Sequence, residues 1–218
     1  MNYLIAGTDT GVGKTFVSCG LIRSIRASNI DCVGMKPICT GEPSDVEALR
    51  LASDQVEPDH LVNPIWLHTP LAPYAAAIVE NRWIDLAALR GSFARLAAKH
   101  AVVVVEGAGG LLVPILADYD FRDLARDLGL SVIVVATNRL GALNHTRLTV
   151  EALEKASLPC SLVILNNVHA IGTSASSAEP NLACQTNLSV LETLLDVPVI
   201  ELAHQERDFS RIVERLQL

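Results

Sequence analysis

The feature that most constrains this chain is a glycine-bearing stretch, Gly7-Thr8-Asp9-Thr10-Gly11-Val12-Gly13-Lys14-Thr15, directly after the apolar run Tyr3-Leu4-Ile5-Ala6. The order predicts a buried strand, a turn and a helix that begins near Lys14. Backbone N–H groups of such a loop, with those of the helix N-terminus, form a cradle for phosphate groups. We expect Lys14 to reach the β- and γ-phosphates and the Thr15 hydroxyl to ligate Mg²⁺.

This stretch departs from the usual phosphate-loop pattern at one position. The pattern places its first glycine five residues before the glycine of Gly-Lys-Thr, but Thr8 occupies that position and Gly7 lies one residue earlier. The alternative is a chance glycine-rich turn. The strand, the loop, the Lys-Thr pair and the helix nevertheless follow one another in the required order, which favours the phosphate loop.

Composition narrows the class of protein. The chain has 218 residues, of which 50% are hydrophobic and only 4% aromatic, and this predicts a single α/β domain (1–218) with a buried parallel sheet. A net charge of −7 disfavours a nucleic-acid partner, and no apolar run approaches the roughly 20 residues that span a bilayer. Five cysteines without a Cys-x-x-Cys pair indicate reduced thiols and a cytoplasmic location.

Apolar segments of strand and helix character alternate along the chain. Predicted strands cover 3–6, 31–35, 65–67, 101–105, 131–137, 161–165 and 197–202. Predicted helices cover 16–27, 44–53, 75–78, 86–100, 121–128, 144–156, 188–195 and 209–216, with loops at 38–43 and 172–180. The alternation predicts a doubly wound, mostly parallel α/β sheet flanked by helices, as in phosphate-loop NTPases.

Ligands of such a sheet bind at the carboxyl ends of its strands, so charged residues there are candidates for function. Glu106 follows four valines and is expected to support Mg²⁺, against the alternative of an ordinary charge at a strand end. Asp45 suits either a metal ligand or a helix cap. Lys36, held by Pro37, is expected to meet an anion, whereas a surface lysine is the alternative. Asn166 and Asn167 could read a purine edge or form a turn.

Four blocks of this sequence together resemble the dethiobiotin synthase family, in that family's order and over roughly residues 1 to 170. They are Gly-Thr-Asp-Thr-Gly-Val-Gly-Lys-Thr at 7–15, Met-Lys-Pro-Ile-Cys-Thr-Gly at 35–41, Val-Glu-Gly-Ala-Gly-Gly at 105–110 and Leu-Gly-Ala-Leu-Asn-His-Thr at 140–146. The resemblance implies an ATP- and Mg²⁺-dependent ligase that joins CO₂ to 7,8-diaminononanoate, closes a cyclic urea and releases ADP and phosphate. It also implies a homodimer.

The resemblance assigns roles by position. Lys36 and Lys14 match active-site lysines, and Thr15, Asp45 and Glu106 match Mg²⁺ ligands. Thr40, Leu140, Gly141 and Asn144 match positions that meet the diamine, the last three across the dimer interface. The matched ATP contacts are Gly11, Val12, Gly13, Lys14, Thr15, Phe16, Asp45, Glu106, Gly107, Ala108, Gly109, Asn166, Asn167, Leu202, Ala203 and His204.

The chain departs from this family's pattern in its last strand. The family usually carries Gly-x-Ile-Pro beside the adenine, whereas residues 199–204 read Val-Ile-Glu-Leu-Ala-His. We therefore expect only a moderate preference for ATP over CTP or GTP, of about 1–3 kcal/mol. Prolines also interrupt residues 43–70, which leaves the rim of the substrate pocket undefined by sequence.

Two other functions remain open from the sequence. A partitioning ATPase would position protein partners, but that class carries a second lysine early in the loop, where this chain has Asp9. Many of its members also end in a basic amphipathic helix, whereas residues 208–215 carry charges of both signs. A small-molecule kinase would share the loop and leave the phosphate on its product rather than in solution.

Overall fold

The structure is a computed structural model that describes residues 1–169 and 182–218. Its centre is a six-stranded sheet in the order β10-β9-β8-β1-β5-β2, in which every neighbouring pair is parallel. The strands are β1 Tyr3–Gly7, β2 Cys32–Met35, β5 Val102–Gly110, β8 Ser131–Thr137, β9 Cys160–Asn166 and β10 Val199–Leu202. The predicted doubly wound parallel sheet is confirmed.

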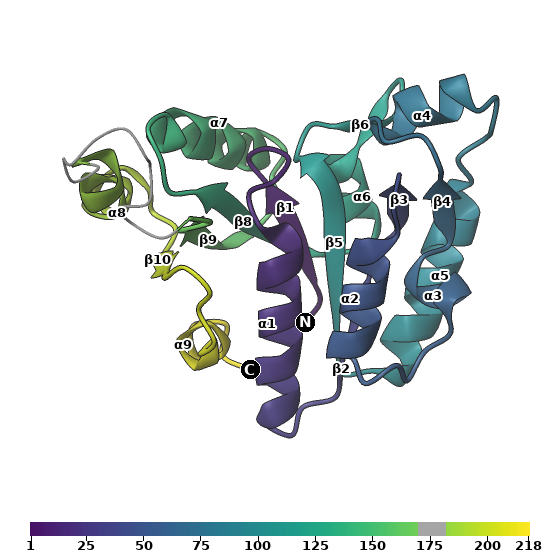
Figure 1. Cartoon of the computed structure of the whole chain (residues 1–218), viewed down its shortest axis with the longest axis horizontal. Helices are drawn as coiled ribbons and strands as arrows, with labels where there is room; N and C mark the ends of the chain where they lie inside the picture. Colours follow the sequence, from purple (N-terminus) through teal and green to yellow (C-terminus); the bar gives the residue numbers. More distant parts are fainter. Residues whose placement is uncertain (170–181) are drawn as a thin grey trace.

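Helices cover both faces of this sheet. They are α1 Lys14–Ala27, α2 Ser44–Ala52, α3 Asp59–Val62, α4 Pro73–Val79, α5 Leu86–Lys99, α6 Phe121–Asp127, α7 Ala142–Lys155, α8 Leu182–Leu194 and α9 Ser210–Arg215. One face packs against α1, α2 and α9 and the other against α5, α6 and α7. α8 lies beside β10 and α7 at the opposite edge from β2 (Figure 1).

The position of β1 sets the location of the site. β1 lies between β5 and β8, and the chain leaves its carboxyl end to form the loop that leads into α1 (Figure 1). All six strands are parallel, so their carboxyl ends share this edge. β5 and β2 lie on one flank of the loop, and β8, β9 and β10 lie on the other.

Several elements differ from the sequence predictions. Residues predicted as a loop contain β3 Ile38–Thr40, which pairs in parallel with β4 Ile65–Leu67 in a separate two-stranded sheet. The short helix α3 and the hairpin of β6 Pro114–Leu116 and β7 Tyr119–Asp120 were not predicted. β5 continues past Glu106 to Gly110, and α8 begins at Leu182 instead of Leu188. The loop predicted at 172–180 lies outside the described residues.

The local sequence explains where the helices on the second face begin. Asp85 accepts hydrogen bonds from the backbone N–H groups of Ala87 and Ala88, and it thereby caps α5. Asp120 and Asp123 form a reciprocal capping box at the start of α6. Within the described part of the chain, every helix is too short or too polar to cross a lipid bilayer.

Candidate functional site

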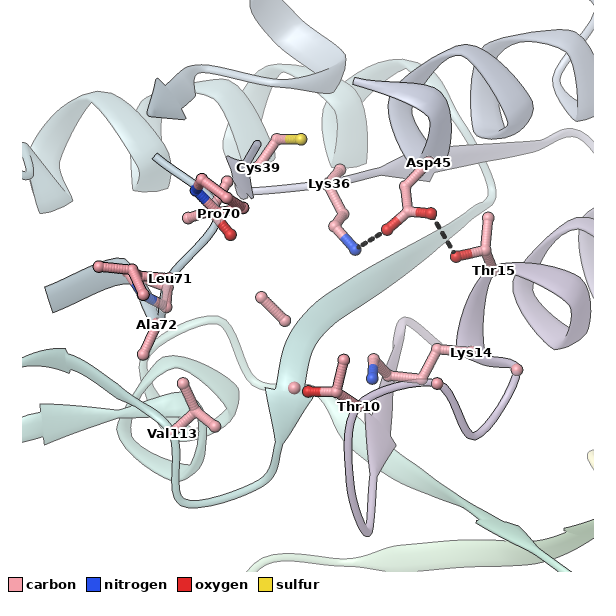
Figure 2. Close-up of a pocket in the computed structure, with 16 residues that line it drawn as sticks. Thr10, Lys14, Thr15, Lys36, Cys39, Asp45, Pro70, Leu71, Ala72 and Val113 are labelled. Carbon is pink, nitrogen blue, oxygen red and sulfur yellow. Dashed lines mark hydrogen bonds and ion pairs between the residues drawn. The ribbon is translucent and has the colours of Figure 1, made fainter. Parts of the chain in front are cut away.

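A cavity of about 570 Å³ opens at the carboxyl edge of the sheet beside the loop. Its lining combines a polar side, from the loop, Lys36 after β2 and Asp45 of α2, with an apolar side from residues 70–73 and Val113 (Figure 2). Of the predicted site residues, it brings together Gly11, Gly13, Lys14, Thr15, Lys36, Thr40, Asp45, Ala108 and Gly109. Residues from four separate stretches of sequence therefore share one hollow.

The glycines of the loop are required by close approach and by backbone conformation. Gly13 has φ of +91°, and a Cβ there would collide with the side-chain amide of Asn166. A Cβ on Gly7 would lie 2.7 Å from the Asp9 carbonyl oxygen and 3.0 Å from Lys14 Nζ. Gly7 is thus needed where the loop folds back on itself, although it precedes the usual first position of the pattern by one residue.

Lys14 begins α1 and lies against the loop. Its Nζ donates a hydrogen bond of 3.2 Å to the Asp9 carbonyl oxygen, and the residue is only 8% exposed. Burial lowers the pKa of Lys14 from 10.5 to about 8, and the nearby positive charge of Lys36 acts in the same direction. A polyanion in the cradle would therefore meet a desolvated ammonium group.

Thr15, Asp45 and Glu106 form an oxygen-rich cluster beside this lysine. The Thr15 hydroxyl lies 2.8 Å from Asp45 Oδ1 and 2.9 Å from Glu106 Oε1. A hydroxyl has one proton, so it can donate fully to only one of these carboxylates. Helix α1 supplies Thr15, the first turn of α2 supplies Asp45, and the interior of β5 supplies Glu106.

Lys36 closes the cluster from the end of β2. Its Nζ lies 2.7 Å from Asp45 Oδ2, 2.6 Å from Glu106 Oε1 and 3.3 Å from the Gly107 carbonyl oxygen. Burial opposes the charge on Lys36, but Glu106 and Asp45 outweigh it and raise the pKa of Lys36 above 10.5. Burial also opposes the charge on Asp45, yet Lys36 and Thr15 hold its pKa below 3.8.

The donor set of this cluster fits a magnesium ion. Glu106 is fully buried, and its Oε2 has no hydrogen-bond partner among the described residues. Two carboxylates and a hydroxyl are hard oxygen ligands, and Mg²⁺ typically takes one or two carboxylates with phosphate oxygens and water. Residues 1–169 and 182–218 contain no group of three or more His, Cys, Asp or Glu side chains suited to a metal held by protein alone.

The apolar side of the cavity was not predicted from sequence. Pro70, Leu71 and Ala72 lie on the side of the hollow where Val113 also lies (Figure 2), and Pro73 belongs to the same lining. Leu71 is 46% exposed and offers an apolar side chain to the cavity. That exposure is visible only in the fold, because the prolines themselves predict nothing more than an interrupted segment.

The three residues matched to the far end of the diamine lie outside the lining of this cavity. Leu140 is 85% exposed, and Gly141 directly precedes α7 with φ of +93°. Asn144 is exposed on the first turn of α7 and lines a different groove, between α7 and α8. Within one copy of the described chain, these residues and Lys36 do not share a pocket.

The remaining predicted nucleotide contacts lie on the other flank of the loop. Asn166 Nδ2 donates a 2.9 Å hydrogen bond to the Val12 carbonyl oxygen. Asn167 Nδ2 donates to Glu201 Oε1 at 2.7 Å and to the Leu202 carbonyl oxygen at 2.9 Å. Ala203 and His204 are exposed after β10. Phe16 packs edge-on against Phe209, with ring centroids 5.7 Å apart, along a separate groove.

Comparison with known proteins places this site in a family. A family model described as an AAA domain matches residues 1–207. The protein named "ATP-dependent dethiobiotin synthetase BioD" of Anaeromyxobacter dehalogenans (strain 2CP-1) is 54% identical over 166 residues, which cover 74% of each chain. The protein of the same name from Akkermansia muciniphila is 38% identical over 218 residues, which cover 99% of each chain.

A solved structure shares the fold at much lower identity. The crystal structure of the hydrogenase maturation factor HypB from Archaeoglobus fulgidus superposes with a TM-score of 0.53 at 14% identity. The superposition covers 100% of this chain and 88% of the HypB chain. At this identity the likeness concerns the fold alone. The sequence relatives match most or all of their own length, and their identity is well above that of the fold neighbour. The chain therefore belongs to the family of ATP-dependent dethiobiotin synthetases.

Proposed function

We propose that the cavity beside the loop is where this chain joins CO₂ to 7,8-diaminononanoate at the expense of ATP. Membership of its family makes the chain an ATP-dependent ligase that forms C–N bonds in biotin synthesis. The assignment of that chemistry to particular residues is our proposal. The observation that carries it is the position of two buried lysines, Lys14 and Lys36, on the wall of one cavity that Asp45 also lines.

The reaction divides into three balanced steps. One amine attacks the carbon of CO₂ and loses a proton, which gives a carbamate. A carbamate oxygen then attacks the γ-phosphorus as the bond to ADP breaks, which gives a carbamic-phosphoric anhydride. The second amine attacks the carbonyl carbon, the bond to phosphate breaks, and the ring closes with loss of a proton. No step needs a covalent bond to the protein.

Each lysine meets negative charge at a different step of this reaction. Lys14, in the loop, binds the β- and γ-phosphates and lowers the charge on the leaving ADP. Lys36 lies beyond the loop and faces the carbamate oxygen as it takes up the phosphoryl group. Fixed cations in a site with little water stabilise such charge without reorganisation. Thr40 and the apolar side formed by residues 70–73 and 113 would receive the diamine.

Thr15, Asp45 and Glu106 would hold Mg²⁺ at the metal side of the loop. When bound, the ion would neutralise phosphate charge and orient the transferred group. Lys36 contacts the same two carboxylates, and a bound ion would release its ammonium group to donate toward the substrate. Glu106 Oε2, which has no hydrogen-bond partner within the described chain, would be available as a ligand of the ion.

A homodimer would complete the diamine site. Leu140, Gly141 and Asn144 lie outside the cavity of their own chain. Leu140, just before α7, and Leu148, in the middle of α7, expose apolar surface. A second copy that packs against this helix would bury these leucines and bring Asn144 to the carboxylate tail of the diamine. The site would then take its phosphate end from one subunit and its tail end from the other.

A coupled assay tests the proposed function. ADP release is measured with ATP and Mg²⁺, and with the diamine or bicarbonate omitted in turn, while dethiobiotin is detected directly. We expect ADP and dethiobiotin in equal amounts only when both are present. ADP release without the diamine would indicate a switch ATPase, and phosphate retained on the product would indicate a kinase.

A further inference from the structure

A polar network joins the ends of β8, β9 and β10 on the flank of the loop opposite to the metal side. Asn138, directly after β8, places its Nδ2 3.1 Å from Asn167 Oδ1 and 3.0 Å from Glu201 Oε1. Asn187 on α8 donates from Nδ2 to Asn138 Oδ1 at 2.9 Å. Asn138, Asn167 and Asn187 are each at most 6% exposed. We call Asn138, Asn167, Asn187 and Glu201 the strand-end network.

The network fixes the asparagine pair that follows β9. The Asn138 backbone N–H donates to the Asn166 carbonyl oxygen at 2.8 Å, while its side chain holds Asn167. Asn167 uses both protons of its amide on Glu201 and on the Leu202 carbonyl oxygen. Asn167 therefore has no amide proton left for a ligand. The Asn166 side chain spends one amide proton on the Val12 carbonyl oxygen and keeps its Oδ1 and its second amide proton for other partners.

The topology places the nucleoside on this flank. The phosphates lie over the loop after β1, and Lys36, Asp45 and Glu106 occupy the side of β2 and β5. The γ-phosphate must point to that side to meet the metal ligands and the substrate cavity. The opposite end of the nucleotide then leaves the loop toward β9 and β10, where Asn166 contacts Val12.

We propose that Glu201 and Asn138 are positioning residues for the adenine base, which they serve by holding Asn166 at the edge of the nucleotide site through the strand-end network. The inference rests on the proposed ATP-dependent function. It also gives a role to β10, the last strand. Glu201 belongs to this strand, in the segment that lacks the glycine and proline usual for the family. A carboxylate that accepts from two asparagines ties β10 to β9 and β8 by side chains instead.

Binding measurements without the diamine test this role. Calorimetry compares ADP, GDP and inorganic tripolyphosphate as ligands of the wild-type chain and of Glu201→Ala, Glu201→Gln and Asn138→Ala. Loss of the acceptor leaves buried amides unpaired, so we expect Glu201→Ala and Asn138→Ala to weaken ADP binding by about tenfold or more. GDP binding should fall less, so the preference for ADP shrinks. Tripolyphosphate has no base, and its affinity should stay within about twofold.

Glu201→Gln is the conservative variant, because its amide oxygen can still accept both hydrogen bonds. We expect it to keep ADP affinity within about threefold of wild type. Glu214→Gln and Glu214→Ala are the matched controls on α9. Glu214 is exposed and lies outside the hollow that Asn167, Glu201 and Ala203 line. In turnover, Glu201→Ala should raise the KM for ATP by about tenfold or more, with a smaller change in kcat.

Two outcomes would overturn the inference. If Glu201→Ala lowers the melting temperature but leaves ADP affinity and the ADP-to-GDP preference unchanged, the network only stabilises the fold. If ADP and tripolyphosphate weaken equally, it acts on the phosphate loop instead of the base. Asn138→Ala breaks the same network after β8 instead of in β10. It therefore decides the question if Glu201→Ala does not fold. A chain that binds ADP as expected but makes no dethiobiotin would contradict the proposed function alone.

Discussion

The ammonium group of Lys36 lies 2.6 Å from a carboxylate oxygen of Glu106, and both side chains are at most 5% exposed. The same ammonium lies 2.7 Å from Asp45, so one lysine bridges the two carboxylates that would hold Mg²⁺. A buried cation between two buried or partly buried anions compensates charge that would otherwise be costly to desolvate. This contact links the metal site to the residue proposed to meet the carbamate.

The first prediction separates the two lysines of the cavity. Lys36→Ala should lower kcat by about 10²–10³ while ATP still binds, since one fixed donor to a developing charge contributes about 3–4 kcal/mol. Lys14→Ala should weaken ATP binding as well. Lys36→Arg should rescue poorly, because a planar guanidinium does not replace a compact ammonium in this position. Calorimetry with ATP beside steady-state turnover measures both effects. Normal turnover of Lys36→Ala would contradict this division of labour.

A second prediction concerns the metal ligands. Asp45→Asn and Glu106→Gln should each raise the Mg²⁺ concentration needed for half-maximal turnover by about tenfold or more, since each replaces a charged ligand by a neutral one. Circular dichroism should show that the fold is kept. The matched control is Glu47→Gln, an exposed glutamate on the same helix as Asp45. If both site variants turn over normally at limiting Mg²⁺, these residues do not bind the metal.

The third prediction tests the shared diamine site. Asn144→Ala should raise the KM for the diamine by about tenfold and leave that for ATP nearly unchanged, because Asn144 lies away from the phosphate loop. Sedimentation at assay concentration should show a dimer. Leu140→Asp should shift this equilibrium toward the monomer and reduce activity in parallel. An active monomer would contradict the shared site.

The fourth prediction concerns stability and pH. Glu57 is buried, and it accepts hydrogen bonds from Lys99 at 3.0 Å and from His100 at 3.0 Å. Burial opposes its charge, but these partners outweigh burial and lower the pKa of Glu57 below 4.5. Because the pKa of Glu57 is lower in the folded chain than in the unfolded chain, its charge stabilises the fold at pH values above the unfolded-state pKa. This contribution is lost as the pH falls through the folded-state pKa.

Glu57→Gln should therefore lower the free energy of unfolding at pH 7 by about 1–3 kcal/mol. The difference from wild type should shrink below a pH of about 4.5, where the native glutamate itself takes up a proton. Urea unfolding at pH 7 and at a pH below about 4.5 measures the effect. Glu154→Gln, at an exposed position, is the control. A difference that does not change with pH would assign the loss to packing instead of charge.

The sequence predicted the parts of the fold that depend on local pattern. The four valines before Glu106 and the lysine before Pro37 gave strong signals, because an apolar run that ends in a charged residue is typical of a buried strand whose carboxyl end meets a ligand. α3 has only four residues and β3 only three, so neither produces a readable period. Residues 70–73 line the cavity only because the fold brings them there.

The strand-end network shows the limit of sequence reasoning in this chain. Asn138 and Glu201 are 63 residues apart, and nothing near either residue predicts the other. From sequence, Asn167 offered a free amide to a base, yet the fold commits both of its protons to β10. Long-range side-chain contacts of this kind carry no local signal, since they depend on which strands become neighbours.

Transfer of oxygen from bicarbonate to phosphate tests the central claim most directly. In the proposed reaction, the carbamate oxygen that attacks the γ-phosphorus leaves with the phosphate when the ring closes. With ¹⁸O-labelled bicarbonate and a reaction time short relative to exchange with water, the released phosphate should carry one ¹⁸O per dethiobiotin formed. Mass spectrometry of the phosphate reads this ratio. Unlabelled phosphate formed in step with dethiobiotin would contradict the anhydride and, with it, the role proposed for Lys36.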